Sequence, residues 1–355
     1  MNAIKYITDM NPLSLREELS AIGEPPFRAK QILHWIYQKL AASFDEMSDL
    51  PLSLRSVLND KFRLCTLSPC GEMTSYGDTI KTLFKLSDGK TIEATLMHYS
   101  QAAGKERNTV CVSTQVGCAV GCPFCATGQQ GFERNLTGGE ILDQVLYFAR
   151  YIKGFGDGKI TNIVFMGMGE PLANYESLLE AIESLNSADM FGLSARNMTI
   201  STAGLVPWIN RLSGEKLQVG LAISLHAADD VLRNRLVPVN KKYPLEELMA
   251  ACRNYFDATG RRITFEYALF TGVNDSPAHA RLLAHLLHGF NCHVNLIPSN
   301  NTANSDYRAP AAEVVKTFKQ ELEKLGINAT IRQSRGQDIS AGCGQLRSRF
   351  MADKK

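Results

Sequence analysis

The stretch VCVSTQVGCAVGCPFC, residues 110–125, decides the fold. Residues 110–114 have the composition of a strand, and three cysteines follow at 118, 122 and 125 with the spacing Cys-x3-Cys-x2-Cys. Gly117 and Gly121 allow the loop to wrap closely, because glycine tolerates positive φ. Three thiolates on one short loop can converge on one metal centre. Four-iron clusters usually take four cysteines, so three would leave one iron open to another ligand.

Two other interpretations of these cysteines are open at this point. A structural zinc site needs a fourth ligand, and His98 or His226 could supply it, although neither has the spacing of a zinc finger. The three thiols could also be buried and unreactive. Lone cysteines are usually small buried hydrophobes, which is the interpretation for Cys65, Cys70, Cys252 and Cys292.

Strand and helix candidates alternate from this stretch towards the C-terminus. This alternation predicts parallel strands joined by helical crossovers, in either a barrel or a doubly wound sheet. Thr137 and Glu140 form a capping box that starts the first helix. The strand candidates are 110–114, 163–166, 198–201, 219–225, 263–269, 294–297 and 329–331, and the helix candidates include 138–152, 178–185, 245–256, 278–287 and 311–325.

The segment before this region has a different pattern. Residues 13–22 and 27–40 and a piece after Pro51 have helical spacing, which predicts a small helical domain. Two strand-like runs, 82–86 and 91–96, follow with Asp88-Gly89 between them, which is a hairpin signal.

Composition excludes several classes of protein. Apolar residues are 45% and charged residues 21% of the 355, which is ordinary globular usage. A net charge of +2 argues against a tail-driven nucleic-acid binder, although a local basic groove is compatible with it. The chain has no apolar run long enough to span a bilayer and no signal-peptide pattern at its start, so we expect a cytoplasmic protein. Clustered thiols in such a protein indicate metal or redox chemistry rather than a disulfide framework.

Polar residues follow several of the predicted strands. In a barrel of parallel strands the chemistry lies where strands end. Gly169 and Glu170 follow one strand, and Ser201, Ser224 and Asn300 stand at or after the ends of others. These positions predict a polar rim around one pocket.

The whole pattern resembles the RlmN/Cfr family of radical S-adenosylmethionine (SAM) RNA methyltransferases, and RlmN more than Cfr. Pro171 after Glu170 and the run 239–242 match RlmN, whereas Asn301 stands where its pattern usually has proline. The resemblance covers about residues 25–346. The matching stretches are 112–118, 125–128, 131–136, 167–172, 223–227, 239–243, 273–275, 295–298 and 341–346.

The resemblance implies a fold and a cofactor site. It implies an α/β fold with an incomplete (β/α)6 radical-SAM barrel at 111–350, a β-hairpin extension and linker at 71–110, and a small helical N-terminal domain at 1–70 that would dock RNA. Three cysteines would hold a 4Fe-4S cluster. The SAM pocket would be lined by Gly169, Glu170, Ser201, Ser224, Leu225, His226 and Asn300.

The resemblance also implies a reaction, which is methylation of carbon 2 of adenosine in ribosomal RNA and tRNA with two SAM molecules per turnover. Cys343 would carry the methyl group, Cys111 would resolve the RNA adduct by forming a disulfide, and Glu93 would accept the ring proton. An external electron donor and a thiol reductant are implied partners, and we expect a monomer that binds no membrane. The alternatives are carbon-8 methylation of the Cfr type and a non-catalytic, zinc-stabilised RNA-binding protein.

RNA binding must come from local basic groups, because the net charge is small. Two groups of arginines and lysines lie near the predicted pocket in the sequence, and RNA is read mainly through single-stranded loops whose bases can be splayed out. They are Arg134, Arg150 and Lys153 near the cluster helix, and Arg332, Arg335, Arg347 and Arg349 near Cys343.

Overall fold

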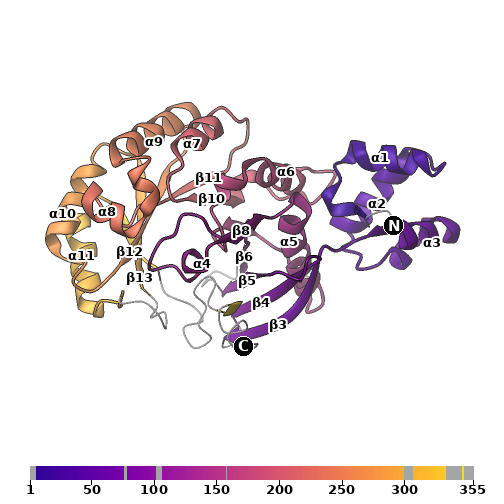
Figure 1. Ribbon diagram of the computed structural model, residues 1–355, viewed down its shortest axis with the longest axis horizontal. Helices are drawn as coiled ribbons and strands as arrows, with labels where there is room; N and C mark the ends of the chain where they lie inside the picture. The colour runs from indigo at the N-terminus through magenta and orange to yellow at the C-terminus, as the bar shows by residue number, and fades with distance from the viewer. Residues whose placement is uncertain are drawn as a thin grey trace.

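The computed structural model describes residues 5–75, 78–100, 106–156, 158–299, 307–332 and 346–347. The N-terminal helices lie to one side of the remaining elements (Figure 1). They are α1 (Pro12–Ala21), α2 (Phe27–Tyr37) and α3 (Leu52–Lys61), beside a parallel pair of β1 (Lys5–Tyr6) and β2 (Phe62–Arg63). Asn11 caps α1 by accepting from the backbone of Leu13 and Ser14.

A ten-stranded mixed sheet forms the main body, in the order β14-β13-β12-β11-β10-β9-β6-β5-β4-β3. The strands from β6 to β14 pair in parallel, and β3, β4 and β5 extend the sheet antiparallel. The bounds are β3 (Leu67–Ser75), β4 (Thr79–Leu86), β5 (Thr91–Ser100), β6 (Glu106–Cys111), β9 (Asn162–Phe165), β10 (Met198–Thr202), β11 (Gly220–Ser224), β12 (Ile263–Leu269), β13 (Cys292–Pro298) and β14 (Ala329–Ile331).

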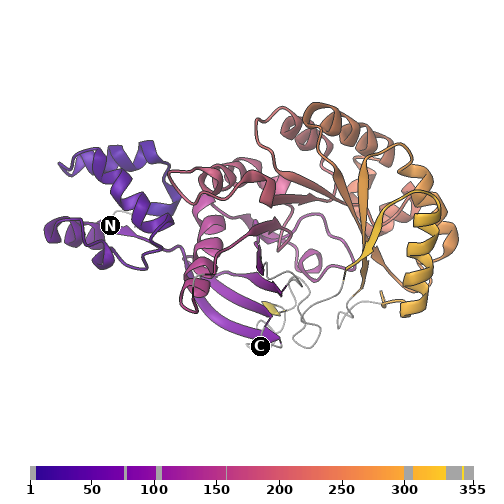
Figure 2. The ribbon, with the colours of Figure 1, turned by 180° about the vertical axis from the view of Figure 1, so that it is seen from behind.

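Helices cover the outer face of this sheet, as both views of the ribbon show (Figures 1 and 2). Strands β6, β9, β10, β11, β12 and β13 are each followed by a crossover helix, which confirms the predicted incomplete barrel of six strand–helix units. The helices are α5 (Gly138–Lys153), α6 (Tyr175–Asn186), α7 (Val206–Ser213), α8 (Asp230–Leu236), α9 (Leu245–Thr259), α10 (Pro277–Leu286) and α11 (Ala312–Lys324).

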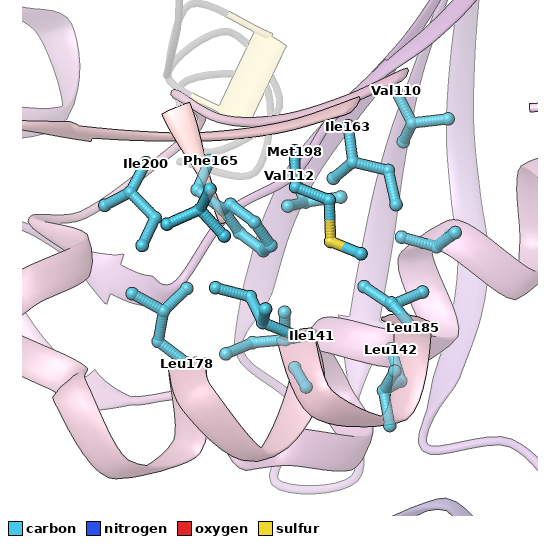
Figure 3. Packing of buried hydrophobic residues seen from close by; sticks show 14 of the residues in the cluster. Val110, Val112, Ile141, Leu142, Ile163, Phe165, Leu178, Leu185, Met198 and Ile200 are labelled. Carbon is cyan, nitrogen blue, oxygen red and sulfur yellow. The ribbon is translucent and has the colours of Figure 1, made fainter. Parts of the chain in front are cut away.

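Alternation along the strands divides apolar from polar side chains. On β10, Met198 and Ile200 pack with residues of α5 and α6 in the core (Figure 3), whereas Ser201 is partly exposed on the opposite face. The register places Ser224 of β11 beside Glu266 of β12 and Glu266 beside Asn295 of β13. Because successive side chains of a strand point to opposite faces, the inner face carries this polar row.

The structure differs from the sequence-based expectation at several elements, including the strand candidate 110–114, of which only Val110 and Cys111 belong to β6. Strand β3 was not predicted, since LSPCGEMTS contains proline and glycine and few apolar residues; it is an edge strand with a register shift between Pro69 and Gly71. Helices α7 and α8 were missed as well, because eight and seven residues are too short for clear periodicity.

Buried polar contacts join the N-terminal part to α5. The carboxylate of Asp143 accepts from Thr8 Oγ1 at 3.1 Å, Thr66 N at 2.6 Å and Thr66 Oγ1 at 2.7 Å. Arg150 donates to the carbonyl of Leu40 and to Cys65 Sγ. We call Thr8, Thr66, Asp143 and Arg150 the α5 joint.

None of the helices in the described ranges is long and apolar enough to cross a membrane.

Candidate active site

A cavity of about 380 Å³ opens on the inner face of the sheet. The residues that line it come from β4 and β5 at one end of the sheet and from β13 and the segment after β14 at the other, so the sheet curls around the cavity. The lining includes Thr79, Thr95, Met97, Tyr99, Cys111, Cys118, Cys122, Phe124, Cys125, Gly169, Glu170, Ser201, Ser224, His226, Glu266, Ile297 and Arg332.

The three-cysteine loop forms one wall of this cavity. Its base is closed by antiparallel pairing of β7 (Gln115–Gly117) with β8 (Phe132–Asn135) and by a bond of 2.9 Å from Cys118 N to Gly131 O. Gly117 has φ +77, and a Cβ there would meet Gly131 O at 1.9 Å, so only glycine fits at this crossing. The loop ends at Cys125, the N-cap of α4 (Ala126–Gln129).

Burial raises the pKa of the Cys118 thiol to about 12 and that of Cys122 well above its usual range. Three neighbouring thiolates therefore need a cation to offset their charge. The donor set fits an iron–sulfur cluster, because it consists of sulfur alone and borders an open volume. Within the described residues no three His, Cys, Asp or Glu side chains are grouped closely enough to hold a single metal ion, and no disulfide joins two of the described cysteines.

The loop after β9 brings Gly169 and Glu170 to the cavity. Gly169 has φ +102, and a Cβ there would meet Gln115 Cβ at 2.6 Å. Glu170 accepts from Leu172 N at 3.1 Å and from Ala203 N at 2.7 Å, while its own N–H donates to Gln115 Oε1 at 2.8 Å. Burial raises the pKa of Glu170 to about 7, against the lowering effect of the Ala203 bond. The carboxylate retains further lone pairs for a ligand.

Polar side chains of the next strands continue the rim. Ser201 Oγ and Ser224 Oγ are 3.4 Å apart. Glu266, which the sequence analysis did not single out, also lines the cavity, and its Oε1 accepts from Asn295 Nδ2 at 2.9 Å. Burial raises the pKa of Glu266.

His226 has the unusual backbone φ of +60, which Asn274 supports by donating from Nδ2 to the His226 carbonyl at 2.9 Å. Burial lowers the pKa of His226 to about 3, so the ring is neutral. Its Nδ1 accepts from Ala268 N at 2.9 Å, which leaves the proton on Nε2 as a donor. Leu225, in contrast, has its side chain in the core and only its main chain near the rim.

Glu93 lies behind the main cavity. It is 3% exposed, and its Oε2 is 2.7 Å from Lys81 Nζ, while Oε1 accepts from Arg347 N. A second cavity of about 10 Å³, the size of one water, lies between Lys81, Glu93 and Cys111. Cys111, the last residue of β6, lines both cavities. Cys343 and Asn300 lie outside the described residues.

The basic residues expected to bind RNA have varied surroundings. Arg134 pairs with Asp88 and Glu140 at 2.7 Å each, and Lys153 donates to Lys39 O. Arg332 lines the cavity, and Arg347 is buried against Glu133, Gln130 and Thr91. Arg150 belongs to the α5 joint, and Arg335 and Arg349 are not among the described residues.

The sequence analysis also missed Arg233, Lys81 and Thr95. Thr95 lies two residues after Glu93 on one face of β5, so the two-residue period of a strand could have pointed to it. Arg233 and Lys81 carry no such signal, because burial of their charges depends on contacts that are distant in sequence.

Comparison with known proteins adds two family models. Residues 112–283 match the radical SAM superfamily, and residues 6–64 match the ribosomal RNA large subunit methyltransferase N-terminal domain. A probable dual-specificity RNA methyltransferase RlmN of Desulfitobacterium hafniense (strain Y51) is 46% identical over 358 residues, covering 100% of both chains. One of Staphylococcus carnosus (strain TM300) is 46% identical over 327 residues, covering 92% of this chain and 88% of its own.

A solved structure is similar over almost the same extent. The crystal structure of a radical SAM methyltransferase from Sphaerobacter thermophilus matches with a TM-score of 0.92 and 50% identity, covering 96% of this chain and 98% of its own.

Proposed function

The chain belongs to the RlmN family of radical SAM RNA methyltransferases, and we propose that it methylates carbon 2 of adenosine in 23S ribosomal RNA and in tRNA. The ribosomal target would lie in the peptidyl-transferase region, and the tRNA target would be the adenosine after the anticodon. The observation that carries the proposal is that one cavity is bordered by the three-cysteine loop, the strand-end residues and Cys111. We further propose a cytoplasmic monomer.

The cofactors follow from the residues around the cavity. Cys118, Cys122 and Cys125 would hold a 4Fe-4S cluster, and Gly169, Glu170, Ser201, Ser224 and His226 would hold SAM. When bound, these cofactors supply a 5′-deoxyadenosyl radical, which can take hydrogen from an unactivated methyl group. Glu170 places negative charge for an ammonium group, and the neutral His226 offers Nε2–H as a donor.

Carbon 2 of adenine is an electron-poor sp² carbon, so it cannot attack SAM as a nucleophile. A thiolate can, and Cys343 is proposed to take a methyl group from a first SAM molecule. A second SAM molecule would then serve the radical step, in which the Cys343 methyl group loses a hydrogen atom and its carbon bonds carbon 2, linking RNA to protein. The ring gives up one electron, which balances the electron that an external donor supplies. Glu93 is proposed to remove the ring proton from the RNA adduct. The Cys111 thiolate would attack the Cys343 sulfur and form a disulfide. The bond between that sulfur and the methylene carbon breaks, and the carbon takes up a proton and leaves as the methyl group of the product. An external thiol then reduces the disulfide by exchange, and an external donor supplies the electron that the cluster needs.

The target adenine of the RNA must be able to enter the cavity. Chemistry on a ring carbon requires the base to leave its stack and enter the site. On β5, Thr95 and Met97 line the cavity on the same face as Glu93, so we propose that the target adenine lies along this strand.

The test is nucleoside mass spectrometry after anaerobic incubation of reconstituted enzyme with methyl-deuterated SAM, a reductant and unmodified RNA. We expect deuterated 2-methyladenosine. Deuterated 8-methyladenosine would instead establish the Cfr-type reaction. Zinc without iron or sulfide in anaerobically purified protein would favour the non-catalytic RNA-binding alternative.

The cysteine roles have a separate test. Cys343→Ala should make no methylated RNA, whereas Cys111→Ala should accumulate a covalent RNA–protein adduct that is visible as a shifted band on a denaturing gel. Cys252→Ala, which alters a buried thiol of α9, is the matched control and should turn over normally. Normal turnover by Cys111→Ala would rule out its resolving role.

A further inference from the structure

The guanidinium of Arg233 in α8 is fully buried. Among the described residues, Arg233 is the largest residue whose side chain is fully buried. It donates to four oxygen atoms, and all four are uncharged. Nε bonds Leu225 O at 3.1 Å, Nη1 bonds Asn240 Oδ1 at 2.7 Å, and Nη2 bonds Ala203 O at 2.6 Å and Ser224 O at 3.3 Å.

Among the described residues, no carboxylate lies within 4.0 Å of this guanidinium. The acid connected to it is Asp230, which is reached only through Asn240, whose Nδ2 donates to Asp230 Oδ1 at 2.8 Å. Asp230 is exposed, so water screens its charge. A neutral side chain with N–H donors could bind these carbonyl groups equally well. Burying a charge without a partner of opposite charge costs folding free energy. The positive charge therefore needs a reason beyond these four bonds.

The guanidinium lies next to the cavity. Ala203 and Ser224, whose carbonyl groups it binds, both line the cavity. Cys122 and Phe124 pack against an apolar cluster that contains Ala203 and also Leu232, the neighbour of Arg233. The three-cysteine loop and the helix that carries Arg233 thus pack on the same apolar cluster, with little water between them to screen the charge.

We propose that Arg233 is the buried counter-cation of the anionic iron–sulfur cluster and makes its one-electron reduction easier. This inference rests on the proposed function, because it requires the cluster at Cys118, Cys122 and Cys125. A cluster held by three thiolates becomes more negative when it takes up an electron. A fixed positive charge in a low-dielectric interior favours that reduced state. The net charge and hydrogen bonds around a cluster set its reduction potential.

Two substitutions separate the charge of Arg233 from its hydrogen bonds. Arg233→Gln removes the charge. Arg233→Lys keeps the charge but loses the planar guanidinium and its fixed arrangement of N–H donors. Asn240→Asp sets a carboxylate against Nη1, so it neutralises the charge while the guanidinium keeps all of its own donors; the donation from Asn240 Nδ2 to Asp230 and Asn234 is lost. Arg253→Gln removes an exposed guanidinium of α9, which lies over the Phe290 ring, and serves as the matched control.

The experiment is a redox titration of the reconstituted cluster in each full-length variant, followed by electron paramagnetic resonance of the reduced cluster. We expect the midpoint potential to become more negative in Arg233→Gln and in Asn240→Asp, and to stay near the wild-type value in Arg233→Lys and Arg253→Gln. Wild-type potentials in both Arg233→Gln and Asn240→Asp would overturn the inference. An equal shift in Arg233→Lys and Arg233→Gln would also overturn it, by assigning the effect to donors rather than charge.

Iron and sulfide analysis precedes the titration and separates the two proposals. A wild-type chain that takes up no cluster would contradict the proposed function and this inference together. A wild-type cluster with a potential that does not depend on Arg233 would contradict this inference alone.

Discussion

The cavity and the α5 joint both bury charged side chains, but they use them differently. In the joint, Asp143 accepts three hydrogen bonds from Thr8 and Thr66, so its charge connects two parts of the chain. At the cavity, Glu170 borders open volume, and Arg233 behind the wall has no carboxylate partner among the described residues.

The difference teaches how to separate a structural charge from one that is available to a ligand. Burial raises the pKa of Asp143 to about 6 and that of Glu170 to about 7, so a perturbed pKa does not distinguish the two regions. Position does, because only Glu170 borders a volume that can hold a ligand. Substitutions in the cavity should therefore alter cofactor binding, and substitutions in the joint should alter folding stability.

The largest expected effect comes from the three-cysteine loop. Cys122→Ala should reduce bound iron and sulfide to near background and abolish methylated RNA, because two thiolates cannot hold the cluster. Its thermal unfolding without the cluster should stay close to that of the wild type. Metal analysis, nucleoside mass spectrometry and calorimetry measure these quantities. Full iron content in Cys122→Ala would show that the Cys122 thiolate does not hold the cluster.

The next effect concerns the joint and depends on pH. Because Asp143 has a folded-state pKa raised from 3.8 to about 6, its protonated form stabilises the fold below about pH 4. This stabilisation is lost as pH rises through about 6, and it amounts to at most about 3 kcal/mol.

Asp143→Asn should remove this dependence. Urea unfolding of both proteins at about pH 4 and pH 7.5 would show wild-type stability falling relative to Asp143→Asn as pH rises. SAM affinity, measured by equilibrium dialysis with the reconstituted enzyme, should not change. A large loss of SAM affinity would show that the joint and the cavity are coupled.

Glu170→Gln makes the converse prediction. Removing the carboxylate charge should weaken SAM binding roughly 10- to 100-fold, the range expected for a hydrogen bond to a charged group. The bonds from Leu172 N and Ala203 N can still reach the amide oxygen one at a time, so the fold should persist. Equilibrium dialysis measures the affinity, with Asp143→Asn as the matched buried acid. If the wild type and Glu170→Gln bound SAM with equal affinity, Glu170 would not be part of the SAM site.

The smallest effect comes from the N-terminus of α5, the helix that carries Asp143. Thr137 Oγ1 accepts from Glu140 N at 3.1 Å, and Glu140 Oε2 accepts from Thr137 N at 3.0 Å. Thr137→Ala should cost about 1 kcal/mol of unfolding free energy. Thr137 also hydrogen-bonds the Asp9 carboxylate, which lowers the pKa of Asp9 against the raising effect of burial, so the loss should be larger at about pH 7.5 than at about pH 4. An equal loss at the two pH values would show that Thr137 does not support the ionised form of Asp9.

Much of the fold could be predicted from periodic patterns. The apolar strand candidates after residue 160 and the helix that starts at Thr137 agree with β9 to β14 and α5, whereas the candidate 110–114 shares only Val110 and Cys111 with β6. Strand β3 and helices α7 and α8 could not be predicted, because edge position and tertiary packing stabilise them more than their own sequence does. The cysteine spacing 118, 122 and 125 is local, so it was visible without a structure.

The remaining parts of the candidate site were less accessible to sequence reasoning. The position of Glu93 behind the cavity depends on Lys81 of the neighbouring strand and on Arg347, which is 254 residues away. The resemblance proposed a role for Glu93, but neither of these partners follows from it. Leu225 was expected among the SAM-pocket residues, whereas its side chain lies in the core.

The sequence by itself determined the local features: the cysteine spacing, the glycines at 117 and 169, the helix cap at Thr137 and the alternation of strands with helices. Each of these depends on residues within a few positions of one another, so a linear pattern carries it. Only the tertiary structure decided which charges are buried and what they face. Arg233 binds Ala203 O, 30 residues away, and Ala203 lines the cavity together with residues from distant parts of the chain. Burial and pairing are properties of three-dimensional neighbours, and no single stretch of the chain contains them.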